Sequence, residues 1–281
     1  MADPERAGNP PAGDPLRLLA VLAHPDDESL GLGGVLAKYA AEGVEVSLVT
    51  ATRGEKGRYH EHRDGPGHPG PRRLGEIREA ELRAAAEILG IRDVAILGHP
   101  DGALDQVDPR EIVAVLAGHI RRVRPHVVIT FPPDGAYGHP DHIAICQFAT
   151  AAVLASADPA FDGGSAHAVS KLYYFVNSEA RMEAYQAAFK KLTSTVDGVE
   201  RHPHPWPEWE ITTLIETRAH TETVWKAVFC HESQISVFDK LRTLPPEHHE
   251  ALWGVTEFYR ALSLVNGGRR RETDLFEGLR P

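Results

Sequence analysis

Short apolar segments alternate with helix-forming segments between residues 16 and 177, and this alternation constrains the fold more than any other feature of the sequence. Nearly continuous apolar runs are typical of strands that are buried on both faces of a parallel sheet. The predicted strands are Leu16–Ala23, Val44–Thr50, Val94–Leu97, His126–Phe131 and Lys171–Val176. The predicted helices between them are Glu28–Ala41, residues 72–89, Pro109–Val123 and Pro140–Ala157. The pattern predicts an α/β domain with a mostly parallel sheet flanked by helices.

The length of 281 residues fits one large domain, or a domain with a small appendage. Residues 1–15 are rich in Pro and Gly, so we expect them to form a disordered lead. Residues 16–281 are expected to form a single domain. Its core would span residues 16–177, followed by a mixed C-terminal extension at residues 178–281, where Pro-rich and helical segments mix.

Charge and cysteine content narrow the class of protein. Forty acidic residues against thirty basic ones give a formal net charge of -10, which does not favour a nucleic acid or an anionic membrane as partner. Cys146 and Cys230 each lie in an apolar stretch, which favours buried free thiols in a reducing compartment. No apolar run reaches the length of a membrane span. We therefore expect a cytoplasmic protein that acts on a small molecule.

Polar side chains follow four of the predicted strands. In parallel α/β sheets, ligands bind beyond the carboxyl ends of the strands, so these side chains should converge on one edge of the sheet. In chain order they are His24, Asp26, Asp27 and Glu28, then Thr52 and Arg53, then His99 and Asp101, and finally Asp134, Tyr137, His139, Asp141 and His142.

Two of these clusters suit a catalytic metal, because a catalytic zinc takes three His or carboxylate ligands and keeps one position for water. His24 and Asp27 could chelate one ion from a single turn. Asp26 and Asp27 should point to different sides of that turn, and the sequence leaves open which of them binds metal and which faces a bound water. His139 and His142 share one face of a helix start, so one could be a ligand while the other contacts substrate.

Other interpretations of these segments are weaker. A single His or Asp is usually a cap or a surface residue, but two clusters at neighbouring strand ends argue against that view. The GLGG at 31–34 lacks the GxGxxG pattern of dinucleotide-binding proteins. Neither Ser29 nor Ser233 lies in a nucleophile elbow. The loop Arg53–Pro71 lacks apolar periodicity, so it is either a mobile lid or disordered.

With AHPDDE at 23–28 and AYGHPDH at 136–142, the sequence resembles the LmbE-like, or PIG-L, family of zinc-dependent de-N-acetylases. The resemblance extends to an RxxE at Arg78–Glu81, LGHPDG at 97–102, HESQ at 231–234 and ETDLFEGL at 272–279. It implies a Rossmann-like fold in which residues 178–281 lie on the substrate side. The roles of HESQ, of the loop at 53–71 and of the arginines near the C-terminus stay unassigned.

The resemblance implies a metal site and a base. His24, Asp27 and His142 would bind zinc, and iron(II) is a second metal that such ligands accept. Asp26 would be the general base.

The resemblance also implies roles for four further residues. His139 would act as an acid or an electrostatic stabiliser, and Tyr137 would polarise the carbonyl oxygen. Arg78 and Asp101 fall where related deacetylases contact substrate hydroxyls, although a salt bridge or a turn cap would also explain them.

The implied function is removal of an N-acetyl group from an N-acetylglucosamine-type conjugate by metal-activated water. A conjugate amidase of the same family is a second interpretation, although the segment ESLGLGG at 28–34 lacks the lysine that those amidases carry there. A sugar-binding protein of the same fold without turnover is a third. A phosphoesterase is disfavoured because it often needs two metals. The sequence leaves a homo-oligomer open.

Overall fold

The computed structural model describes residues 14–62, 64–161, 164–189, 193–196, 198–234, 236, 239–243, 245–268 and 270–280. The lead expected at residues 1–15 lies almost entirely outside the described residues. Among the helices that are described, none combines the length and the apolar character needed to cross a membrane. Cys146 and Cys230 are both free thiols. Cys146 is buried as expected, whereas Cys230 is partly exposed, because it lies just past the end of a helix.

The central sheet of the described chain has seven strands in the order β3-β2-β1-β4-β5-β9-β8. Its parallel part consists of β1 (Arg17–Leu22), β2 (Glu45–Thr52), β3 (Asp93–His99), β4 (Val127–Thr130) and β5 (Lys171–Val176). Two antiparallel strands, β9 (Val255–Ser263) and β8 (Thr213–Glu216), extend it. The predicted mostly parallel α/β sheet is confirmed. The strand order reverses between β1 and β4, which is where such sheets bind ligands.

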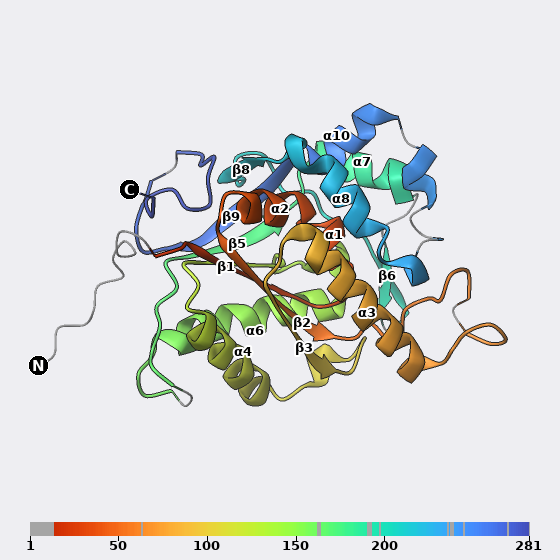
Figure 1. Cartoon of the computed structure of the whole chain (residues 1–281), viewed down its shortest axis with the longest axis horizontal. Helices are drawn as coiled ribbons and strands as arrows, with labels where there is room; N and C mark the ends of the chain where they lie inside the picture. Colours follow the sequence, from red (N-terminus) through yellow and green to blue (C-terminus); the bar gives the residue numbers. More distant parts are fainter. Residues whose placement is uncertain are drawn as a thin grey trace, which may run out of the picture.

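Helices cover both faces of this sheet (Figure 1). On one face, α4 (Pro109–Val123) packs against α6 (Pro140–Ala157). On the other face, α2 (Gly33–Ala41), α3 (Pro71–Leu89) and α8 (Thr221–Val228) pack against one another. Beyond them, α7 (Glu179–Phe189) and α10 (Pro246–Trp253) contact each other, and β6 (Ser194–Val196) and β7 (Val199–Arg201) form a separate hairpin.

Local sequence sets the ends of the longer helices. The Asp108 carboxylate accepts a hydrogen bond from the backbone N–H of Arg110 at 2.8 Å, which caps α4. His139 caps α6 in the same way, because its Nδ1 accepts from the N–H of Asp141 at 3.2 Å. Helix α3 ends at Gly90, whose φ of 75° is a left-handed conformation that favours glycine. The cap of α6 includes His139, which belongs to the predicted site.

The predicted helix Glu28–Ala41 is wrong in one respect, because the structure divides it into α1 (Asp27–Leu30) and α2. Leu32 leaves the helical region, with φ -122° and ψ -3°. Gly31 lies so close to the ring of Phe175 on β5 that an added Cβ would be 3.2 Å from it. Gly31, Gly33 and Gly34 are poor helix formers and favour a break here, and the contact with Phe175 leaves no room for a side chain at position 31.

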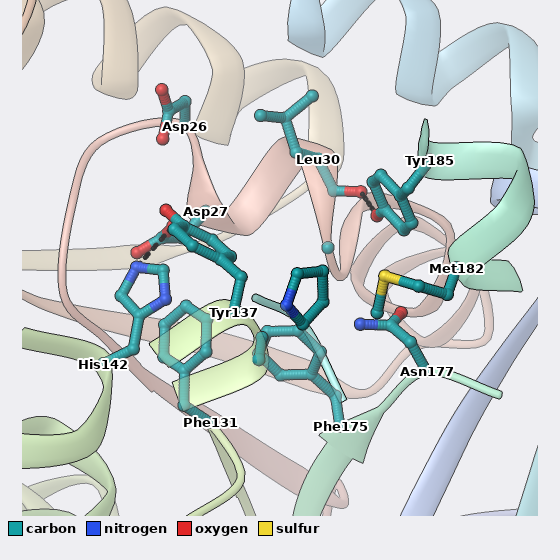
Figure 2. Close-up of a pocket in the computed structure, with 13 residues that line it drawn as sticks. Asp26, Asp27, Leu30, Phe131, Tyr137, His142, Phe175, Asn177, Met182 and Tyr185 are labelled. Atoms are coloured by element: carbon teal, nitrogen blue, oxygen red, sulfur yellow. Dashed lines mark hydrogen bonds and ion pairs between the residues drawn. The ribbon is translucent and has the colours of Figure 1, made fainter. Parts of the chain in front are cut away.

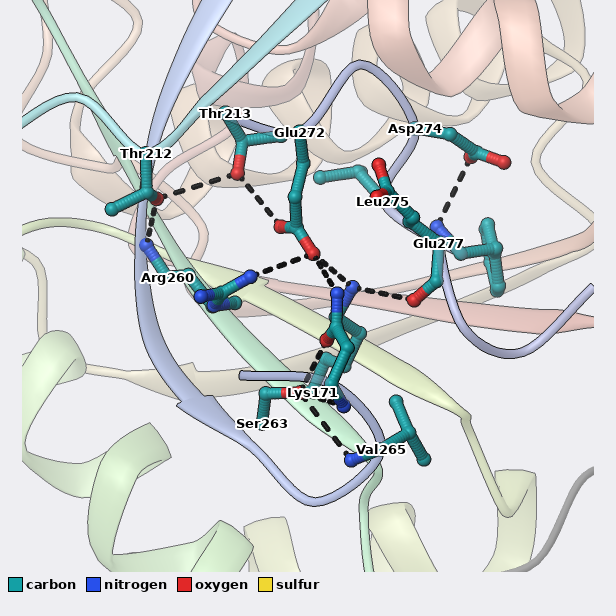
Figure 3. Close-up of polar contacts among 12 residues, drawn as sticks. Lys171, Thr212, Thr213, Arg260, Ser263, Val265, Glu272, Asp274, Leu275 and Glu277 are labelled. Carbon is teal, nitrogen blue, oxygen red and sulfur yellow. Dashed lines mark hydrogen bonds and ion pairs between the residues drawn. The ribbon is translucent and has the colours of Figure 1, made fainter. Parts of the chain in front are cut away.

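A buried charged cluster ties the C-terminal segment to the sheet (Figure 3). One oxygen of Glu272 lies 2.7 Å from Lys171 Nζ and 2.8 Å from Arg260 Nη1. The other accepts from the hydroxyls of Tyr173 and Thr213 at 2.7 and 3.0 Å. These four partners lie on the neighbouring strands β5, β9 and β8. Residues after 178 therefore complete the same sheet that the N-terminal part begins.

Candidate active site

The predicted site residues meet beyond the carboxyl ends of β1, β3 and β4. Figure 2 shows four of them around one cavity, namely Asp26, Asp27, Tyr137 and His142. The turn after β1 supplies His24, Asp26 and Asp27, and the turn after β3 supplies Asp101. The short helix α5 (Gly135–Gly138) and the start of α6 supply Tyr137, His139 and His142. Arg78 reaches the same region from α3.

His24, Asp27 and His142 form a small triangle of donor groups, in which the two oxygens of Asp27 face different imidazoles. His24 Nδ1 lies 3.2 Å from His142 Nε2 and 3.6 Å from Asp27 Oδ2, and His142 Nε2 lies 3.5 Å from Asp27 Oδ1. A tetrahedral ion with bonds of about 2.0–2.2 Å holds its ligands about 3.3–3.6 Å apart. The spacing of the three donor groups therefore fits a metal site.

Hydrogen bonds orient both imidazole rings. His24 Nε2 lies 3.0 Å from Asp141 Oδ2 and 3.2 Å from Asp101 Oδ1, and His142 Nδ1 lies 3.2 Å from the carbonyl oxygen of Gly135. Because these oxygens accept, the facing nitrogens carry the protons. Burial opposes a charge on His24, but the carboxylates of Asp101, Asp141 and Asp27 outweigh it and raise the pKa of His24. Without a metal, a proton therefore joins His24 Nδ1 to His142 Nε2, and a bound cation would take the place of that proton.

The charge states of Asp27 and His142 suit metal binding. Burial opposes the charge on Asp27, but His142 and His24 outweigh it and lower the pKa of Asp27 to about 2. Burial lowers the pKa of His142 to about 3, although the Asp27 charge opposes this. The His142 ring also stacks on Phe131 with 3.7 Å between centroids, which fixes its plane. An ionised carboxylate and a neutral imidazole are the forms that bind a metal.

Among the described residues, two groups bring one donor atom from each member within 4.8 Å of one another, and Asp27 is in neither. They are His24, His139 and His142, and His24, Asp101 and Asp141. In the second group, the Asp141 oxygens already accept from the backbone N–H groups of Gly102 and Leu104 at 2.7 and 3.0 Å. Asp141 therefore fixes the orientation of His24 at Nε2, the ring nitrogen that does not face His142. In the first group, the Nδ1 of His139 accepts the α6 cap bond, so only its Nε2 remains for a ligand.

Asp101, predicted to bind substrate, is only 7% exposed. Its Oδ2 accepts from the backbone N–H of Lys56 at 2.8 Å, while Oδ1 contacts His24. Burial opposes its charge, but the bond to His24 outweighs burial and lowers the pKa of Asp101. The structure thus places Asp101 against Nε2 of His24. Its contact with substrate stays a prediction.

Asp26 lies beside the triangle. Its φ of 106° is a left-handed conformation that costs a residue with a side chain about 1–3 kcal/mol. Its N–H donates to Glu28 Oε2 at 3.0 Å, and its Oδ2 lies 3.0 Å from Arg78 Nη2. Burial raises the pKa of Asp26 to about 6, with Arg78 opposing and Asp27 reinforcing the change. Such a carboxyl group can accept and return a proton near neutral pH.

Arg78 is buried, with 4% of its surface exposed. Its Nη1 donates to the carbonyl oxygen of Gly54 at 2.9 Å, and its Nη2 donates to the carbonyl oxygen of Pro25 as well as to Asp26. Arg78 therefore joins α3 to the turn that carries Asp26. Its predicted contact with substrate stays a prediction.

Tyr137 and His139 complete the surroundings of the triangle. The ring centroid of Tyr137 lies 5.2 Å from that of His142, and the centroid of His139 lies 4.9 Å from that of His24. Ala136, with φ 65° and ψ -50°, kinks α5 just before Tyr137. Burial raises the pKa of Tyr137, so its phenol keeps its proton at neutral pH. Burial also lowers the pKa of His139.

Two segments to which the sequence assigned no role, HESQ at 231–234 and the loop at 53–71, lie next to this site. His231 Nε2 lies 2.8 Å from Glu28 Oε1, and both side chains are fully buried. In the same HESQ segment, Ser233 bonds to both oxygens of Glu81 on α3 at 2.6 and 2.7 Å. Gln234 Nε2 donates to the carbonyl oxygen of Arg58 at 2.6 Å. The last of these bonds attaches Arg58 to the body of the protein, and the role of the loop at 53–71 stays a prediction.

Sequence reasoning assigned no role to Asp141, Glu28 or His231. The signal was present, because Asp141 and Glu28 lie inside the two motifs and His231 begins HESQ. Only the structure shows that Asp141 faces His24 and that Glu28 and His231 face each other.

Residues 19–153 match the family described as PIG-L: GlcNAc-PI de-N-acetylase. A 1D-myo-inositol 2-acetamido-2-deoxy-alpha-D-glucopyranoside deacetylase from Streptomyces avermitilis is 37% identical, over 94% of this chain and 98% of its own. The N,N'-diacetylchitobiose deacetylase from Pyrococcus horikoshii has a similar fold, with a TM-score of 0.63 at 21% identity over 88% of this chain and 84% of its own.

The 4-carboxy-2-hydroxymuconate hydratase GalB from Pseudomonas putida KT2440 also has a similar fold, with a TM-score of 0.68 at 18% identity over 90% of this chain and 99% of its own. A hydratase on this fold means that the fold alone does not determine the reaction. Identity to the Streptomyces avermitilis protein along nearly the whole of both chains is the stronger finding. On that identity and on the matching family model, the chain belongs to the PIG-L family of GlcNAc-PI de-N-acetylases.

Proposed function

We propose that the protein is a zinc-dependent hydrolase that removes the N-acetyl group from an N-acetylglucosamine-type conjugate. The observation that carries this proposal is the triangle of His24, Asp27 and His142, with Asp26 and Tyr137 beside it on one cavity. The relative from Streptomyces avermitilis supports the substrate class, because its name specifies an acetamido sugar joined to inositol.

His24, Asp27 and His142 would hold the metal. Two imidazoles and a carboxylate are a donor set that zinc takes at catalytic sites, and iron(II) accepts similar ligands. Metal binding would release the proton that the raised pKa of His24 keeps on its ring. When bound, zinc supplies a Lewis acid that polarises a carbonyl and makes water more acidic.

Asp26 would act as the general base. Its Oδ2 is held by Arg78 and its N–H by Glu28, so Oδ1 is the oxygen positioned to accept a proton from the attacking water. With a pKa of about 6, the carboxyl group could then return that proton to the nitrogen of the leaving amine. Amide and water would thereby give a free amine and acetate, with no other reactant.

Tyr137 and His139 would act on the other atoms of the amide. The phenol of Tyr137 keeps its proton at neutral pH, so it could donate a hydrogen bond to the carbonyl oxygen as negative charge develops there. His139 would stabilise this charge or protonate the leaving nitrogen through Nε2, because its Nδ1 is used in the helix cap.

The test is release of free amine from 2-acetamido-2-deoxyglucosyl inositol by the zinc-loaded protein. We expect equal amounts of amine and acetate, loss of activity with a chelator and recovery on adding zinc. Absence of amine from this compound and from other N-acetylglucosamine conjugates would contradict the proposal.

A further inference from the structure

The cavity beside Asp26 and Asp27 is larger than an acetyl group requires. Its volume is about 230 Å³, whereas an apolar cavity of about 150 Å³ already holds a benzene molecule. It begins at the donor triangle and continues between α1, β5 and α7 (Figure 2). Part of a bound molecule other than the acetyl group therefore has room there.

The walls of this cavity away from the metal ligands are mainly apolar. They are formed by Leu30, Phe175, Met182 and Tyr185, while Phe131 lines the cavity beside the ligand His142. The hydroxyl of Tyr185 donates to the backbone carbonyl of Leu30 at 3.0 Å, so this side chain contributes its ring to the wall. Met182 is 5% exposed and has the flexible thioether side chain that adapts to different apolar shapes.

Polar groups are scarce at the same end. Among the described residues that line the cavity there, Asn177 has the only side chain with an amide, and it is 9% exposed. Asp26 and Asp27 are the charged lining residues, and both lie at the donor triangle. A ring carrying several hydroxyls would lose its hydrogen bonds to water at the apolar end without replacing them, at a cost of about 1–3 kcal/mol for each group.

We propose that this apolar end is a subsite for an apolar group, of about the size of an aromatic ring or a chain of four to six carbons, located near the amide that is cleaved. This inference rests on the proposed amide hydrolysis and concerns which acyl group or aglycone the same site accepts. Either side of the amide could supply the group: an acyl chain longer than acetyl, or an apolar aglycone on the sugar. Polar parts of the substrate would lie outside the apolar end.

The experiment measures kcat/KM of the zinc-loaded protein in two series of substrates. In one series the aglycone is inositol and the N-acyl group is acetyl, butyryl or hexanoyl. In the other the acyl group is acetyl and the aglycone is inositol, methyl or phenyl. A rise of about tenfold along the acyl series assigns the subsite to the acyl chain, and a rise along the aglycone series assigns it to the aglycone.

Met182→Gln tests whether the cavity causes the preference. We expect this variant to lose about tenfold in kcat/KM for the preferred apolar substrate and little for the inositol conjugate of the acetyl sugar. Leu154→Gln, a matched change at a side chain that is 62% exposed on α6, should leave both values unchanged.

Three outcomes overturn the subsite. They are a fall in kcat/KM along both series, equal values along both, or an equal loss for all substrates in Met182→Gln with native folding. Failure of the proposed function looks different, because then no member of either series yields free amine.

Discussion

Nη2 of Arg78 lies 3.0 Å from Oδ2 of Asp26, and the same guanidinium bonds to the carbonyl oxygens of Pro25 and Gly54. A single buried side chain thus holds the proposed base, the residue just before it and the turn after β2. Arg78 was predicted from sequence to bind substrate, and its observed contacts indicate that it positions Asp26.

Arg78→Lys separates these two roles. Lysine keeps the charge but cannot bridge three acceptors with a planar fork, so Asp26 should lose its fixed position. We expect kcat to fall about 10- to 100-fold with KM nearly unchanged and zinc content intact. Arg83→Ala, at an exposed position on the same helix, is the control and should retain both constants. A rise in KM at constant kcat would instead support the substrate-binding role.

The buried pair of His231 and Glu28 should support Asp26 from a second side, because Glu28 Oε2 accepts the N–H of Asp26. We expect His231→Ala to lower kcat about tenfold or more at unchanged zinc content. His231→Gln, whose amide can donate to Glu28, should recover part of the loss. Equal kcat in the two variants would show that this hydrogen bond does not position the base.

Asp141 should strengthen metal binding without touching the metal. Its carboxylate faces Nε2 of His24 at 3.0 Å, and such partners typically contribute 10- to 100-fold to metal affinity. Competition with a chromogenic chelator should show zinc affinity lower by about this factor in Asp141→Asn. Asp105→Asn, an exposed matched change, should bind zinc like the wild type. Unchanged affinity in Asp141→Asn would contradict the orienting role.

The cluster around Glu272 predicts a pH dependence of stability. Burial opposes the charge on Glu272, but hydrogen bonds from Lys171, Tyr173 and Asn266 outweigh it and lower the pKa of Glu272 to about 2 from its usual 4.5. Because the folded state has the lower pKa, this contribution to the free energy of unfolding is present above about pH 4.5 and is lost as pH falls toward 2.

Urea unfolding of Glu272→Gln checks this dependence. At pH 7 we expect a loss of about 3 kcal/mol, because Lys171 and Arg260 would keep buried charges without their partner. The difference from the wild type should shrink as pH falls below 4.5. Glu222→Gln, which removes an exposed ion pair with Lys226, should unfold like the wild type at every pH. A constant difference from pH 7 to pH 3 would contradict the assignment.

Much of the fold could be predicted, because local patterns determine it. The five parallel strands follow from apolar runs, and α3, α4 and α6 end near the expected residues. The break at Gly31 was missed although the glycines of GLGG at 31–34 lower helix propensity there. The contact of Gly31 with Phe175, which lies far away in the sequence, could not be predicted. Strand β9 was missed because its partners β5 and β8 come from separate segments, so its place depends on long-range pairing.

For the site, the motifs predicted which side chains meet but not all of their contacts. His24, Asp27 and His142 come together because each follows the end of a strand near the reversal of strand order. The direction of Arg78 depends on how α3 packs, which its sequence does not specify. The apolar cavity was also missed, because its walls are assembled from α1, β5 and α7.

The central claim is that His24 helps to bind the metal whereas Asp26 performs proton transfer beside it. The most direct test measures bound zinc by elemental analysis and amine release from the acetamido sugar conjugate in Asp26→Asn and His24→Ala. Asp26→Asn should retain one zinc per chain and lose at least about 100-fold in kcat, whereas His24→Ala should lose the zinc. Asp26→Asn protein that is free of zinc, or that turns over like the wild type, would contradict the account.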